Sequence, residues 1–193
     1  MRPDASGSES GLAARAAAGE PGAFDELGRR WWERIGRYAA AAAAGDPELA
    51  EEIAQETLVR LHGALPRFRG DSSLGTFVYR ICRNAAADAI RRRRRERRRA
   101  APLPDPEDPA LASPAAGPED RALREEERAA VSRALATLKP GERGLLYLKE
   151  GEDFGLDELS RIFGVPEGTV KSRLSRARAR LKAALEEEGY GSD

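Results

Sequence analysis

Residues 157–178 read DELSRIFGVPEGTVKSRLSRAR, which is a short helical segment, a turn containing Gly164 and Pro166, and a second helical segment. Apolar residues recur at helical spacing on both sides of the turn, so each helix is expected to bury one face. These residues are Leu159, Phe163, Val165, Val170, Leu174 and Leu181. The pattern is typical of a helix-turn-helix, in which the second helix enters the major groove of DNA.

The opposite face of the second helix is basic and hydroxylic. Residues 161–182 hold seven basic residues against the single acid Glu167, an excess too large for ordinary pairing along a solvated helix face. Side chains in the first turns of such a helix reach base edges, whereas later ones contact phosphate. The candidates for base edges are Thr169, Lys171, Ser172, Arg173 and Arg176, and the candidate for phosphate is Arg180.

Charge is segregated along the rest of the chain. Basic and acidic residues balance at 33 each over 193 residues, but residues 91–99 hold eight arginines and one glutamate. Residues 46–56 hold five acids and no base, so the sequence predicts an acidic surface without a compensating base nearby. Separate blocks of opposite sign indicate separate partners: nucleic-acid phosphate for the arginine run, and a basic protein surface for the acidic one.

Apolar periodicity predicts helices almost throughout. Asp46 is placed to cap a helix that starts at Pro47, and Ser73 to cap the helix that leads into the arginine run. In the C-terminal half, Val131, Leu135 and Leu138 are expected to form a buried stripe. The predicted fold is all-α, with two small helical domains joined by a flexible linker. The predicted boundaries are a disordered segment 1–11, domains at 12–99 and 123–187, an acidic, Pro-rich linker at 100–122, and a tail at 188–193.

Several classes of protein are disfavoured by what the sequence lacks. Cys82 is the only cysteine, so no internal disulfide and no zinc site made of cysteines can form. No run of about 18 apolar residues and no signal-peptide core is present, which predicts a cytoplasmic protein without membrane contact. We find no nucleophile triad, phosphate loop or metal-ligand set, so the sequence predicts neither an enzyme nor a cofactor.

Two stretches resemble the extracytoplasmic-function (ECF) sigma factors of bacterial RNA polymerase. Residues 46–57 and 66–84, with the arginine run that follows, resemble region 2 of that family. Residues 165–178 resemble its region 4. With the connecting helices, the resemblance covers about residues 12–187 in the family's order and spacing.

The resemblance implies a role for each surface. Glu52, Gln55 and Glu56 would dock on core RNA polymerase. A second set would hold the −10 promoter element as the duplex opens: Arg69, Asp71, Ser72, Ser73, Arg80, Arg83, Asn84 and Arg91. Thr169, Lys171, Ser172, Arg173, Arg176 and Arg180 would bind the −35 element as duplex. The family also implies an anti-sigma factor as a further partner.

The sequence departs from the family pattern at a few positions. Gly155 stands where a serine usually caps the first helix of the motif, which predicts a slightly weaker cap, and Gly75 replaces a commonly basic residue.

Two other functions stay open at this point. A stand-alone helix-turn-helix regulator would need only the C-terminal domain, and an arginine-rich nucleic-acid enzyme would need a site that the sequence does not show.

Overall fold

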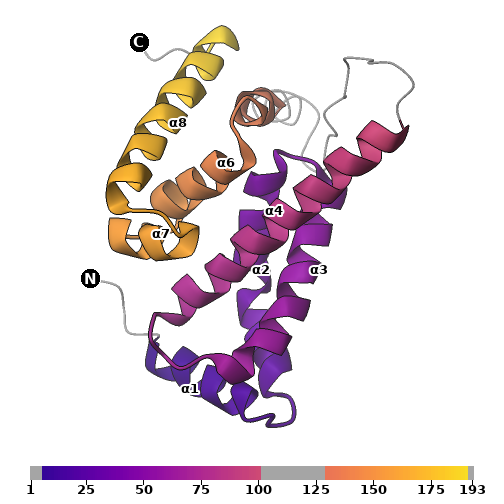
Figure 1. Cartoon of the computed structure of the whole chain (residues 1–193), viewed down its shortest axis with the longest axis vertical. Coiled ribbons are helices and arrows are strands. Elements are labelled where there is room, and N and C mark those ends of the chain that lie inside the picture. Colours follow the sequence, from indigo (N-terminus) through magenta and orange to yellow (C-terminus); the bar gives the residue numbers. More distant parts are fainter. Residues whose placement is uncertain (1–5, 101–128, 191–193) are drawn as a thin grey trace, which may run out of the picture.

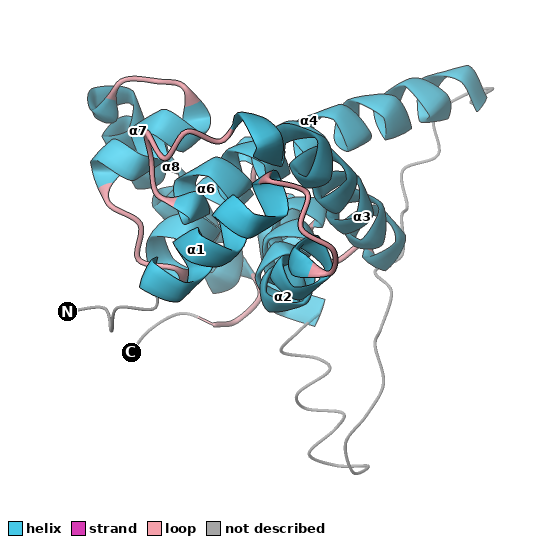
Figure 2. Cartoon of the chain, turned by 90° about the horizontal axis from the view of Figure 1, so that it is seen from below, coloured by secondary structure: helices cyan, strands magenta, loops and turns pink. Residues whose placement is uncertain are grey.

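The computed structural model describes residues 6–100 and 129–190, and within them every regular element is helical (Figures 1 and 2). The N-terminal bundle comprises α1 (Ser6–Ala17), α2 (Ala23–Ala43), α3 (Pro47–Ala64), a short 3-10 turn η1 (Leu65–Arg67) and α4 (Leu74–Ala100). The C-terminal bundle comprises helical residues 129–136, α6 (Pro140–Leu146), a π-helical turn η2 (Tyr147–Gly151), α7 (Leu156–Phe163) and α8 (Glu167–Glu187). The all-α prediction is confirmed.

Local signals set where the N-terminal helices start. The Asp46 carboxylate accepts a hydrogen bond from the Leu49 N–H at 3.0 Å, and Pro47 occupies the first turn of α3, where its missing N–H costs nothing. The Ser73 hydroxyl accepts from the Thr76 N–H at 3.1 Å and so caps α4. Both predicted caps are confirmed. Trp31, Ile35 and other apolar residues of α2 then face the centre of this bundle.

The N-terminus differs from the prediction. Helix α1 begins at Ser6, so residues 6–11, expected to be disordered, are part of a helix. Leu12 and Ala13 in this helix are buried, and burial of this apolar pair against the bundle offsets the weak helix preference of the preceding serines and glycines. The predicted linker, apart from Ala100 at the end of α4, and residues 1–5, 123–128 and 191–193 lie outside the described residues.

The C-terminal bundle also corrects one prediction. Val131 is 45% exposed, whereas Ala130, Ala134 and Leu138 are buried. Leu138 is buried as expected and Leu135 is partly buried against the core, so only Val131 is wrong, and Ala130 and Ala134 complete the buried stripe. Alanine is small enough to let helices approach closely, so side-chain size outweighs hydrophobicity at these positions.

The two bundles pack against each other through aromatic residues. Phe154, which follows η2, is buried, and its ring meets that of Tyr79 on α4 edge-on with centroids 5.3 Å apart. Gly75 makes this approach possible, because a Cβ atom there would lie 3.3 Å from the Phe154 ring and 3.6 Å from that of Trp31. The departure from the family pattern at Gly75 thus has a packing role in this chain.

Helix α6 supplies a second set of contacts between the bundles. The guanidinium of Arg143 is buried and donates to the Ala42 carbonyl near the end of α2, with Nε at 3.0 Å and Nη2 at 2.6 Å. Its Nη1 donates to the Leu138 carbonyl at 2.9 Å. Gly144, the next residue, lies so close to Tyr38 that an added Cβ atom would be 2.6 Å from the phenolic oxygen. The two bundles are therefore joined by buried hydrogen bonds and by close packing of α6 against α2.

Polar contacts at the edge of this interface are partly exposed. Arg34 of α2 forms an ion pair with Glu152 at 3.1 Å, and the Tyr147 hydroxyl donates to the same carboxylate at 3.0 Å. The guanidinium of Arg34 also lies 4.0 Å from the centre of the Trp31 ring. These contacts lie at the edge of an interface whose interior holds apolar and aromatic side chains together with the buried guanidinium of Arg143.

Candidate nucleic-acid interface

The helix-turn-helix forms as the sequence predicts. Gly164 ends α7 in the left-handed conformation, at φ 64°, and its N–H donates to the Ser160 carbonyl at 2.8 Å. The Ser160 hydroxyl donates to the Val165 carbonyl at 2.7 Å and thereby ties the helix to the turn. At the start of α7, the Gly155 N–H donates to the Glu158 carboxylate at 3.0 Å, which is one half of a capping box. The other half, a side-chain acceptor at the N-cap, is missing because residue 155 is glycine, as the sequence predicts.

The outward face of α8 carries the predicted base-reading and phosphate residues. Val170, Leu174 and Ala177 are buried against the bundle, which leaves Lys171, Ser172 and Arg176 exposed and Thr169 and Arg173 half-buried. Within the described residues, the Arg176 guanidinium donates to the backbone of its own helix, at the Ser172 carbonyl. Arg180 is engaged, because it forms an ion pair with Glu142 of α6 at 2.9 Å. Both hydrogen bonds of this pair are donated by Nη1, and the Arg180 side chain stays 46% exposed, so only part of the guanidinium is engaged.

The predicted −10 residues lie on the loop before α4 and along α4. Arg69, Asp71 and Arg80 are exposed. The Ser73 hydroxyl is occupied by its capping role and by a contact of 2.9 Å with the Thr76 hydroxyl. Because the loop joins η1 to the capped start of α4, its side chains are held beside the first turn of that helix.

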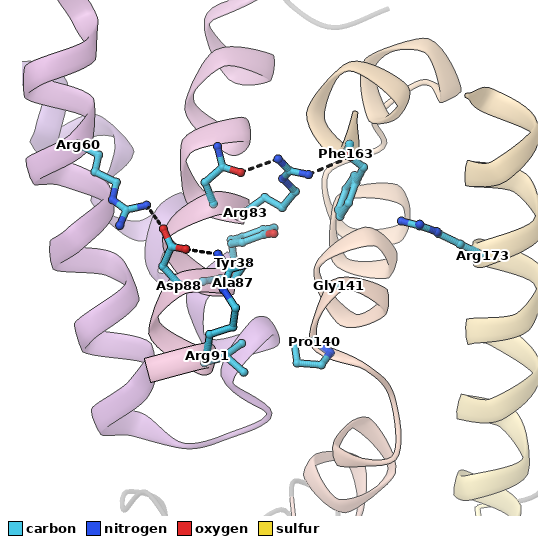
Figure 3. Close-up of a pocket in the computed structure, with 13 residues that line it drawn as sticks. Tyr38, Arg60, Arg83, Ala87, Asp88, Arg91, Pro140, Gly141, Phe163 and Arg173 are labelled. Carbon is cyan, nitrogen blue, oxygen red and sulfur yellow. Dashed lines mark hydrogen bonds and ion pairs between the residues drawn. The ribbon is translucent and has the colours of Figure 1, made fainter. Parts of the chain in front are cut away.

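The two predicted DNA-binding surfaces meet at one cavity. A cavity of about 580 Å³ lies between α4 and the C-terminal bundle (Figure 3). Arg83, Asn84 and Arg91 line it from α4, and Arg173 points toward it from α8. Arg83 crosses between the bundles, since Nη1 donates to the Phe163 carbonyl at 2.9 Å while Nη2 donates to the Asn84 side chain at 2.5 Å.

Two lining residues of this cavity, Arg60 and Asp88, were not among the site residues predicted from the sequence. Asp88 accepts a hydrogen bond from Arg60 of α3 at 2.7 Å and another from Arg91 one turn further along α4. These two guanidinium groups lower the pKa of Asp88. The spacing of Asp88 and Arg91 is a visible signal of a pair on one helix, but the contact with Arg60 depends on how α3 and α4 pack.

The acidic surface of α3 differs from the prediction. Glu52 pairs with Arg92, and Arg93 lies 3.1 Å from Asp46, so bases from the arginine run do compensate this cluster. Glu56 pairs with Arg60 at 2.7 Å. The prediction failed because α4 returns antiparallel along α3, which brings together residues about 40 positions apart in the sequence. Gln55 stays exposed and donates to Glu51 at 2.9 Å.

Comparison with known proteins agrees with this geometry. The chain matches the Sigma-70 region 2 family over residues 25–96 and the Sigma-70, region 4 family over residues 128–181. It is 34% identical over 178 residues to the ECF RNA polymerase sigma factor SigM of Mycobacterium tuberculosis, which covers 92% of this chain and 85% of that protein. The chain belongs to the ECF sigma factors. This sigma factor is an alternative one that acts in transcription initiation.

Solved structures of other sigma factors share the fold. The sigma factor RpoE of Bartonella quintana, solved with the anti-sigma factor NepR, gives a TM-score of 0.67 at 23% identity and covers 86% of this chain and 98% of that one. CnrH, solved with the cytosolic domain of CnrY, gives 0.63 at 28% identity and covers 91% and 96%. The fold of this sigma factor is thus that of a two-domain ECF sigma factor.

Other kinds of site are not found in the part of the chain that the structure describes. Residues 6–100 and 129–190 contain no group of three or more histidine, cysteine or acidic side chains arranged to hold a metal ion. None of the described helices is both long and apolar enough to cross a membrane. Cys82 is buried, and burial raises the pKa of its thiol to about 12.

Proposed function

We propose that this sigma factor binds bacterial core RNA polymerase in the cytoplasm and directs it to promoters with two elements. The acidic face of α3, with Glu52, Gln55 and Glu56, would dock on polymerase. The loop before α4 and the exposed side of α4 would hold the melted −10 element, while the start of α8 would read the −35 duplex. The observation that carries this proposal is the presence of both sigma domains, in order, in one chain. Polymerase, and not this chain, performs the chemistry.

The proposal requires that the two domains separate. Promoter elements two helical turns apart lie about 70 Å from each other along B-DNA. Arg83 and Arg173 line a single cavity in the structure, so one duplex cannot reach both surfaces in this arrangement. We therefore treat the described state as a closed form, and propose that promoter binding requires the contacts of Arg83, Arg143 and Gly144 with the opposite bundle to break. An anti-sigma factor is a further proposed partner, supported by the complex of the RpoE relative with NepR.

Run-off transcription tests the proposed function directly. Core polymerase would be incubated with and without the chain on a pool of genomic fragments, and the transcript 5′ ends would be sequenced. We expect new start sites that share two spaced upstream elements. If the folded chain gives no new starts, and instead binds duplex DNA tightly without polymerase, it is a stand-alone regulator.

A double substitution tests whether α8 recognises the −35 element. Arg173→Ala with Arg176→Ala removes two guanidinium groups from the first turns of α8, and each bidentate base contact is worth about 1–3 kcal/mol of discrimination. We expect at least a tenfold loss of transcription from promoters with the −35 element, measured against a promoter with a mutated element. Arg161→Ala, which removes an exposed arginine from α7, is the matched control. Unchanged selectivity in the double variant would rule out these two residues as readers.

A further inference from the structure

The acidic face of α3 and the arginine run of α4 are joined by ion pairs. Nη2 of Arg93 lies 3.1 Å from Oδ2 of Asp46 and 3.5 Å from Oε2 of Glu48. Arg92 pairs with Glu52 one turn further along α3. The Arg93 and Asp46 side chains are only 29% and 25% exposed, so this pair is partly shielded from solvent. These contacts occupy the groups with which each surface would meet its own partner.

Only part of the arginine run takes part. Arg94, Arg95 and Arg98 line a separate cleft of about 290 Å³ with Arg91. Successive residues of an α-helix are rotated by about 100°, so Arg94 and Arg98 lie on the side of α4 opposite to Arg92 and Arg93. The part of α4 that carries these arginines projects beyond the rest of the described bundle (Figures 1 and 2), where nucleic acid can reach it.

We infer that the arginine run and the acidic face of α3 mask each other, so that the chain binds core polymerase and nucleic-acid phosphate with positive coupling. The inference rests on the proposed function, in which polymerase takes the carboxylates and DNA backbone takes the arginines. A partner that binds one surface must displace the internal pairs, and this releases the other surface for its own partner. Coupling between two binding sites is reciprocal, so promoter DNA favours polymerase docking as much as polymerase favours DNA.

The expected size of the effect follows from the exposure of the pairs. Ion pairs at a protein surface are individually weak, because solvent and salt screen them and two long side chains must be ordered. Releasing the carboxylates from both Arg92 and Arg93 should therefore strengthen polymerase binding about fivefold. A fivefold change in affinity can be measured, and pairs this weak can still be displaced by either partner.

The first test compares two double variants in the absence of DNA. Binding of the labelled full chain to core polymerase would be titrated at about 0.1 M salt, where the Debye length is about 10 Å. Arg92→Ala with Arg93→Ala should bind about fivefold more tightly than the natural sequence. Arg94→Ala with Arg98→Ala makes the same change in charge on the opposite side of the same helix and should bind unchanged. An equal gain in both variants would reveal a general charge effect, and no gain in the first would also overturn the masking.

The second test examines the opposite surface without polymerase. Glu52→Gln frees Arg92, whereas Glu51→Gln removes the same charge from the neighbouring position, which contacts Gln55. Anisotropy of a labelled single-stranded oligonucleotide should show two- to threefold tighter binding for the first variant than for the second. Equal affinities would overturn the inference.

A third variant separates this inference from the proposed docking face. Glu56→Arg reverses a charge at the proposed polymerase contact, outside the pairs with Arg92 and Arg93. If the docking face is correct, this variant binds core polymerase at least tenfold more weakly than Glu33→Arg, a change on the exposed side of α2. If it binds equally well, the docking face is wrong and the proposed function of α3 fails. If it binds weakly while Arg92→Ala with Arg93→Ala shows no gain, only the masking fails.

Discussion

Replacing Arg143 by methionine should lower the free energy of unfolding by about 2–3 kcal/mol. The substitution keeps much of the side-chain volume but removes the donors that satisfy the Ala42 and Leu138 carbonyls, both of which then lie at a buried interface without that partner. Part of the loss is offset, because burying the guanidinium is itself unfavourable. That cost is visible in the pKa of Arg143, which burial lowers to about 10. The net effect stays destabilising, since charge-assisted hydrogen bonds to buried acceptors are among the stronger ones.

Urea unfolding followed by circular dichroism would measure this change. Arg161→Met is the matched control, because Arg161 is exposed on α7 and its loss should change stability by less than about 0.5 kcal/mol. Equal stabilities for the two variants would mean that Arg143 contributes nothing to the contact between the bundles. Because Arg143 bridges the bundles, its variant should also unfold less cooperatively, with the two halves of the transition separating.

Features set by neighbouring residues could be predicted from the sequence. The turn at Gly164 and the caps at Asp46 and Ser73 depend on residues within three or four positions, and all three are found as expected. Val131 was wrongly expected in the buried stripe of the C-terminal bundle because valine is more hydrophobic than alanine, although close packing of helices favours the smaller side chain.

Contacts between distant segments could not be predicted in this way. The resemblance to ECF sigma factors supplied the roles of the surfaces, but no local pattern shows that Arg92 and Arg93 lie along α3. Nor does any local pattern show that Arg143 donates to the end of α2. Basic residues in the sequence look alike whether they face solvent, a carboxylate of the same chain or the carbonyls of another helix. Burial and packing decide among these, and both belong to the tertiary structure.

Gly144→Ala should open the interface and raise promoter-dependent transcription several-fold at limiting sigma factor. In an isolated helix this change would be favourable, since alanine is a better helix former than glycine by about 1 kcal/mol. Here the added methyl group would lie 2.6 Å from the phenolic oxygen of Tyr38 and 2.9 Å from its Cζ atom. Tyr38 is buried, and its ring lies against those of Tyr79 and Tyr147, with centroids 5.7 and 6.1 Å away. Shifting the phenol toward the cavity that it lines disturbs these contacts, so overpacking costs the closed form about 1–3 kcal/mol. The open form, in which α6 leaves α2, pays none of it.

The chain provides a matched control and a rescue for this variant. Gly141→Ala lies on the same helix with no atom within 4 Å of the added Cβ, so it should stabilise α6 without changing transcription. Tyr38→Phe removes the closest atom and should partly restore the closed form when it is combined with Gly144→Ala.

A fluorescence transfer pair with one dye on each bundle would report the opening directly. Apparent affinity for a promoter scales with the fraction of open molecules, so the gain in transcription should match the gain in that fraction. Opening without any gain in transcription would show that the closed form does not limit promoter binding.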